Sequence, residues 1–98
     1  MLRGIESTIY GKNLSYDYLV WIRRNAIRFG LKGITFFKND GSIKTIAEGE
    51  EKNLLFFVKK LRRGRFVLPL FSPVENFSVN WEEPKHDFED FSISETGE

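Results

Sequence analysis

Few side chains in this sequence have the type and spacing that catalysis or metal binding requires. The single histidine, His86, lies beside Asp87 in a polar loop, where it could bind a cation or exchange a proton. A lone histidine in such a loop is more often inert. The sequence has no cysteine, so disulfides and thiolate metal sites are excluded. No motif pairs a serine with the histidine, as nucleophilic catalysis would require. We therefore predict no metal site and no cofactor.

A run of cations from Lys59 to Arg65 could contact the phosphates of a nucleic acid. The same run ends a predicted helix, where the negative end of the helix dipole favours cations without any ligand. The sequence also lacks the alternation of basic, glycine and aromatic residues that is typical of RNA-binding sheets. We therefore expect no nucleic acid partner.

Aromatic residues are numerous, with ten phenylalanines and two tryptophans in 98 residues. That number exceeds what a two-layer core of this size readily encloses. Adjacent residues of a strand point to opposite faces, so Phe36 and Phe37 cannot both be buried on one side. One of them, with Tyr10, could form an exposed patch on an open sheet face. The candidate interaction patch for another protein or a second copy is Tyr10, Phe36 and Phe37; alternatively, these side chains cover one another.

The hydrophobic period alternates between strand and helix along the chain. Alternating apolar residues predict a strand at about 4–11, and apolar residues spaced three and four apart predict an amphipathic helix over 18–29. Ser15 or Asp17 is the expected N-cap of this helix. Gly30 is its expected left-handed end.

A hairpin and a second helix follow. Two β-rich runs at 34–38 and 43–48 flank Asp40-Gly41, a pair that is typical of tight hairpin turns. An amphipathic helix is predicted over 51–63, with glutamates in its first turn and cations in its last, as the helix dipole favours. Gly64 is expected to end it.

The last third of the chain predicts two more strands, over 73–81 and 88–94, joined by a polar loop. The order strand-helix-strand-strand-helix-strand is the split β-α-β arrangement of α+β ferredoxin-like folds, here with a short extra C-terminal strand. We expect a two-layer sandwich with both helices on one face of an antiparallel or mixed sheet. A single domain over 1–94 would precede a frayed tail at 95–98.

The spacing of three short motifs resembles that of the acylphosphatase family. They are Gly30-Leu31-Lys32-Gly33 after the first helix, Asp40-Gly41 in the hairpin, and Ala47-Glu48-Gly49 on the next strand. Each motif is weak alone, and their joint spacing carries the resemblance. Further matches at Phe71-Ser72-Pro73-Val74 and Phe91-Ser92-Ile93 extend it over nearly the whole chain. The resemblance implies the ferredoxin-like fold of that family.

The resemblance also places the family's active site on the loop after the first strand. In acylphosphatases, backbone N–H groups and an arginine surround the phosphoryl group, and an asparagine on the next strand orients the attacking water. Here those two positions hold Leu19 and Phe37, which makes a degenerate active site. Asp17 adds a carboxylate that opposes an anion. The candidate phosphate-binding loop comprises Lys12, Asn13, Leu14, Ser15, Tyr16, Asp17 and Tyr18.

Three residues could replace the lost groups. Lys12 supplies a cation without the planar fork of an arginine, Arg23 lies one helical turn after Leu19, and Asn39 would need the strand to slip by two residues. The sequence therefore favours a hydrolase homologue that has lost acyl-phosphate hydrolysis and acts as a binding or self-association module, rather than an enzyme. The alternative is an acylphosphatase-type hydrolase of acyl phosphates or other small phosphorylated compounds with displaced catalytic groups.

Charge is distributed unevenly behind a net value of +1. Residues 1–65 hold 14 Lys and Arg against 6 Asp and Glu, a balance of +8, whereas residues 66–98 hold 1 against 8, a balance of −7. The two parts could attract each other within one fold, or the basic part could bind a small phosphorylated anion. No apolar run approaches the roughly 20 residues that cross a bilayer. We expect no membrane association and, by default, a cytoplasmic location.

Overall fold

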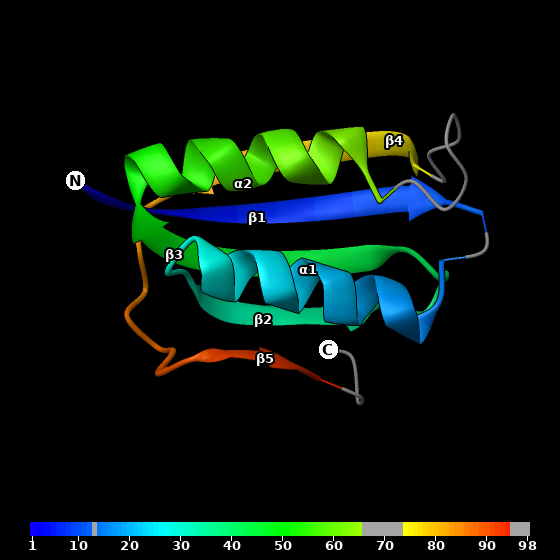
Figure 1. Ribbon diagram of the computed structural model, residues 1–98, viewed down its shortest axis with the longest axis horizontal. Helices are drawn as coiled ribbons and strands as arrows, with labels where there is room; N and C mark the ends of the chain where they lie inside the picture. The colour runs from blue at the N-terminus through cyan, green and yellow to red at the C-terminus, as the bar shows by residue number, and fades with distance from the viewer. Residues whose placement is uncertain (13, 66–73, 95–98) are drawn as a thin grey trace.

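The computed structural model describes residues 1–12, 14–65 and 74–94. In this part of the chain, two helices lie side by side on one face of a five-stranded sheet (Figure 1). The sheet order is β4-β1-β3-β2-β5, in which only the β2–β5 pair is parallel. This is the predicted split β-α-β sandwich. Its elements are β1 (Leu2–Gly11), α1 (Tyr16–Arg28), β2 (Lys32–Phe37), β3 (Ile43–Glu50), α2 (Glu51–Arg63), β4 (Val74–Glu82) and β5 (Phe91–Ile93).

Element boundaries agree with the sequence prediction within two residues, except at the start of β5. Helix α1 begins at Tyr16, two residues before the predicted start, because the apolar stripe begins at its first buried residue, Tyr18. Strand β5 is only Phe91–Ile93, because it pairs with β2 over three residues and the preceding segment bends. The tail predicted at 95–98 and the Phe71-Ser72-Pro73 part of a family motif lie outside the described residues.

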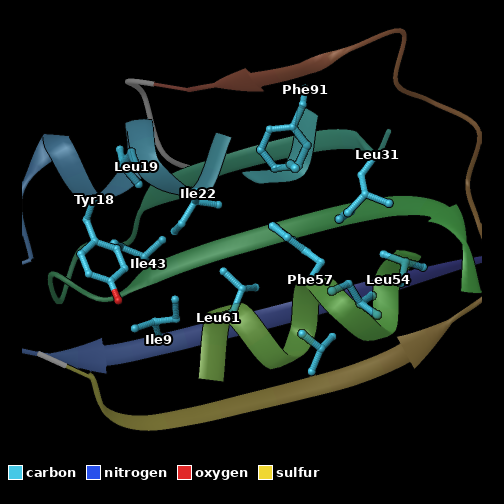
Figure 2. Packing of buried hydrophobic residues seen from close by; sticks show 14 residues of the cluster. Ile9, Tyr18, Leu19, Ile22, Leu31, Ile43, Leu54, Phe57, Leu61 and Phe91 are labelled. Atoms are coloured by element: carbon cyan, nitrogen blue, oxygen red, sulfur yellow. The ribbon is translucent and has the colours of Figure 1, made fainter. Parts of the chain in front are cut away.

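The core lies between the sheet and the two helices (Figure 2). On β1, Ile5, Ser7 and Ile9 are buried toward the helices while the residues between them are half-buried, which is the expected period of two. Most of the predicted helical stripes are fully buried, and Phe29 packs at the edge of the cluster. The buried helical residues are Tyr18, Leu19, Ile22, Asn25 and Ala26 of α1 and Leu54, Phe57, Val58 and Leu61 of α2.

Gly33 allows two backbones to approach where the chain enters β2. Its φ is +151°, and a Cβ atom built there would lie 1.9 Å from the carbonyl oxygen of Ile46 on β3. Gly30, with φ of +70°, turns the chain out of α1 as predicted. These two glycines set the path of the chain from α1 into β2. They therefore determine which residues of β2 face the helices.

Glu48 holds the segment that crosses from β4 to β5. Its side chain is buried, and its carboxylate accepts hydrogen bonds from the backbone N–H groups of Lys85 at 2.6 Å and His86 at 3.1 Å. The segment thereby carries the chain from one edge of the sheet to the other. No helix among the described residues is long and apolar enough to span a membrane.

Candidate functional site

The fold brings together the two positions that the family resemblance assigns to the catalytic arginine and asparagine. Leu19 of α1 and Phe37 of β2 line one hollow of about 200 Å³, together with Tyr16 and Ser94. Phe37 faces the helices because it lies two residues after Thr35, whose side chain is on that face. Leu19 lies at the same end of α1 as Tyr18 (Figure 2). The geometry of a shared site is therefore present.

The described lining of this hollow is largely apolar. Leu19 is 2% exposed and belongs to the core, and Phe37 packs against that core. The polar side chains of the lining are two hydroxyls, from Tyr16 and Ser94. A phosphoryl dianion needs donors that carry charge or point inward together. Within the described lining, no guanidinium and no side-chain amide is present.

The three replacement groups considered from the sequence are directed elsewhere. The Nζ atom of Lys12 lies 3.9 Å from a carboxylate oxygen of Glu75 on β4, and its side chain is exposed. The Nε–H of Arg23 donates to the carbonyl oxygen of Phe91 at 3.0 Å. Asn39 is exposed after β2, where the chain turns toward β3. None of the three lines the hollow.

The rest of the candidate phosphate loop divides between core and solvent. Leu14 packs against the core, and Tyr18 belongs to it. Ser15 is the N-cap of α1, but its side chain makes no capping hydrogen bond. Asp17 is exposed in the first turn of that helix, and Asn13 lies outside the described residues. The described side chains of this loop therefore do not converge on one anion.

Tyr18 joins the loop to the end of α2. Its hydroxyl accepts a hydrogen bond from the backbone N–H of Arg65 at 2.8 Å. Burial raises the pKa of Tyr18 above its ordinary value of 10.0. The hydrogen bond and the charge of Arg65 lower this pKa, but by less than burial raises it. Tyr18 therefore stays neutral and acts here as a packing and hydrogen-bonding residue.

The family assignment comes from the whole chain rather than from these side chains. The sequence profile of the acylphosphatase family matches residues 6–93. This chain belongs to the acylphosphatase family. A protein named acylphosphatase from Dehalococcoides mccartyi is 31% identical over 90 residues, which are 91% of this chain and 94% of that protein.

Solved acylphosphatases share its fold. The structure of acylphosphatase from Bacillus subtilis superposes with a TM-score of 0.81 at 26% identity, covering 96% of this chain and 99% of the other. An acylphosphatase from Coxiella burnetii gives a TM-score of 0.76 at 26% identity, with coverages of 95% and 93%. The βαββαβ order with a short added strand is thus the acylphosphatase fold.

The three aromatic residues of the candidate interaction patch lie on two faces of the sheet in this acylphosphatase-family chain. Tyr10 is 40% exposed, whereas Phe36 is only 5% exposed. Phe37 points to the opposite face of the sheet from Phe36 and lines the hollow beside Leu19. Strand alternation therefore places one of the two phenylalanines, Phe36, on the same face of the sheet as Tyr10. Whether Tyr10 contacts a partner stays a prediction.

Some exposed apolar side chains lie outside the candidate interaction patch. Ile27, Leu55 and Phe56 lie on the helices and are each about half exposed, at 50%, 48% and 46%. Phe56 stacks on Phe29 with ring centroids 6.2 Å apart. The adjacent pair Phe56-Phe57 was the available signal, because only one of two neighbours fits a narrow helical stripe.

His86 has a backbone role in this structure. Its φ is +59° and its side chain is exposed. Its backbone N–H donates a hydrogen bond to the carboxylate of Glu48. Among the described residues, no group of three histidines, cysteines or acidic residues is placed to bind a metal ion. The positive φ follows from the path of the β4–β5 crossing segment.

Proposed function

We propose that this member of the acylphosphatase family has lost acyl-phosphate hydrolysis and acts as a binding module. The observation that carries the proposal is the hollow in which Leu19 and Phe37 meet. The family positions still converge, but the side chains that occupy them are apolar. Hydrolysis needs a positive cradle for the phosphoryl group and an oriented water molecule, and neither residue provides them.

The energetic argument uses the cost of each missing group. Removing one preorganised donor to a developing anion typically lowers turnover about 10²- to 10³-fold. Bringing a phosphoryl dianion against the apolar side chains of Leu19 and Phe37 would add a desolvation cost without a compensating ion pair. Even if the two losses are not additive, little of the family's turnover would remain.

The alternative is a hydrolase in which another cation replaces the arginine. Arg23 supports this alternative best, because it lies one turn after Leu19 on α1. For this role its guanidinium would have to leave the carbonyl oxygen of Phe91, which it binds at 3.0 Å. Lys12 would have to leave Glu75 in the same way.

The test is the hydrolysis of an aryl acyl phosphate, with the acylphosphatase from Bacillus subtilis as a positive reference. We expect a kcat/KM at least about 10²-fold below that of the reference. We also expect Arg23→Ala and Lys12→Ala to leave any residual rate unchanged. Turnover at the level of the reference would contradict the proposal. A rate that falls in Arg23→Ala would favour a displaced active site instead.

A further inference from the structure

A group of cations lies around Trp21, away from the Leu19 and Phe37 hollow. Lys60, Arg63 and Arg65, from the end of α2 and just beyond it, line a hollow of about 290 Å³ together with Trp21 and Gly64. These cations belong to the basic run Lys59–Arg65. The fold therefore directs part of that run toward one aromatic ring of α1.

A second hollow of about 230 Å³ shares Trp21 and Arg65 with the first. It is also lined by Arg24, Val20 and Asp17. A ligand that extends past the Trp21 ring would thus meet cations from both helices. We define the Trp21 region as Trp21, Arg24, Lys60, Arg63 and Arg65.

The cations of the two hollows and of the basic run differ in their partners within the fold. The guanidinium of Arg62 lies 5.3 Å from the ring centroid of Phe77, which gives it a partner within the fold. By contrast, the side chains of Arg24 and Lys60 have no ion pair among the described residues. Two such cations, one in each of the hollows that share Trp21, leave a positive potential that an anion can neutralise.

The helix dipoles do not explain this charge cluster. The start of α1 and the end of α2 lie at the same end of the molecule, at the right of Figure 1, and the Tyr18–Arg65 hydrogen bond joins them. The partial positive charge of one terminus therefore offsets the partial negative charge of the other. In the described lining of the two hollows, cationic side chains outnumber carboxylates, of which Asp17 provides one.

We propose that the Trp21 region binds a small molecule carrying two or more phosphate groups, with Arg24, Lys60, Arg63 and Arg65 as its cationic contacts. Either hollow alone is smaller than a typical small-molecule site of about 300–1,000 Å³, whereas the two together reach that range. Cations in two hollows that share Trp21 fit an extended polyanion better than a single phosphate. Arginine and lysine both bind phosphate oxygens through charge-assisted hydrogen bonds.

This inference goes beyond the proposed loss of hydrolysis and does not depend on it. The site lies on the side of α1 that holds Trp21, whereas the degenerate site lies on the side that holds Leu19. A chain that hydrolyses acyl phosphates could still bind a polyphosphate here. The result of the binding assay described below therefore does not depend on the result of the hydrolysis assay.

Binding is measured by the fluorescence of Trp21 in a Trp81→Phe background at low ionic strength. Trp81 lies next to Arg3, with its ring centroid 5.4 Å from that guanidinium, so phenylalanine keeps an aromatic ring there. The probes are inorganic triphosphate, inorganic phosphate and a nucleoside triphosphate. We expect saturable binding of triphosphate, at least about tenfold weaker binding of phosphate, and loss of affinity with added salt. Tighter binding of the nucleotide than of triphosphate would identify a nucleotide as the ligand.

The matched pair of variants is Lys60→Ala and Lys59→Ala. They remove the same charge from neighbouring positions of α2, but only Lys60 lines the hollow. We expect Lys60→Ala and Arg24→Ala each to weaken triphosphate binding about tenfold. Lys59→Ala should change it less than about twofold. Both substituted lysines are exposed, so folding should be unaffected.

Several outcomes would overturn the proposal. Equal losses in Lys59→Ala and Lys60→Ala would indicate nonspecific attraction to a basic surface. A loss confined to Lys12→Ala would place the anion on the loop before α1. Tighter binding of a single-stranded oligonucleotide than of triphosphate would indicate a nucleic acid surface. The absence of saturable triphosphate binding by the parent would also reject it.

Discussion

The segment from Gly30 to Gly49 and the segment from Gly11 to Leu19 differ in what their residues do. In the first, Gly33 allows β2 to approach β3, and the carboxylate of Glu48 binds two backbone N–H groups. In the second, the residue at the family's arginine position, Leu19, fills the core. The first segment thus determines the path of the backbone, whereas the described side chains of the second divide between the core and solvent.

The largest expected effect concerns the backbone approach at Gly33. Gly33→Ala would place a Cβ 1.9 Å from a backbone oxygen of Ile46, which no side-chain rotation can relieve. We expect a loss of about 4 kcal/mol or more in the free energy of unfolding, or a failure to fold. Gly4→Ala is the control, because a Cβ there meets its nearest atom at 3.4 Å. Equal stability of the two variants in urea denaturation would show that β2 can shift away from β3.

The second prediction tests the packing role of Leu19. Leu19→Ala should lower the free energy of unfolding by about 2–5 kcal/mol, as for other buried leucines. Tyr16→Ala removes a larger side chain from the same hollow, but that side chain is 52% exposed, so its cost should be below about 1 kcal/mol. A Leu19→Ala cost as small as that of Tyr16→Ala would mean that the position has no structural role.

The third prediction concerns the carboxylate of Glu48. Glu48→Gln keeps the shape of the side chain, but its NH2 group cannot accept one of the two N–H bonds that the carboxylate oxygens now accept, so we expect a loss of about 1–3 kcal/mol. Hydrogen exchange at the amides of Lys85 and His86 should accelerate more than exchange in β1. Unchanged protection of these two amides would argue that Glu48 does not hold the crossing segment.

The smallest expected effect is a pH dependence from Tyr18. Burial raises the pKa of Tyr18 in the folded state above the unfolded value of 10.0, so the folded state keeps the proton after the unfolded state has lost it. This contribution to stability is fully present below pH 10.0 and is lost as pH rises through the folded pKa. The parent should therefore lose more stability above that pH than Tyr18→Phe does. Parallel stability curves for the two proteins would contradict this assignment.

Much of the fold could be predicted because its signals are local. The ends of α2 follow from acidic residues at Glu50-Glu51, cations in the last turn and Gly64, and the hairpin follows from Asp40-Gly41. The short length of β5 could not be predicted. It depends on pairing with β2 and on the crossing segment that Glu48 holds, and both are contacts between distant parts of the chain.

The candidate site was predictable only in part. The family resemblance located Leu19 and Phe37, and the structure brings them to one hollow. The helical period predicted that Leu19 faces the sheet, and Leu19 is buried, but the period could not show which residues of other elements line a hollow with it. Nor could it show that Arg24 and Lys60 meet at Trp21, since they come from different helices.

The most direct measurement of the central claim is acyl-phosphate hydrolysis by the parent chain and by the triple variant Asp17→Gly, Leu19→Arg and Phe37→Asn. The variant removes a carboxylate and returns the fork donor and the water-orienting amide. Because Leu19 is buried, circular dichroism must first show that the variant is folded. We predict for the parent a kcat/KM at least about 10²-fold below that of the Bacillus subtilis acylphosphatase, and at least about a tenfold gain for the folded variant. A parent that already hydrolyses the substrate as fast as the Bacillus subtilis acylphosphatase would contradict the account.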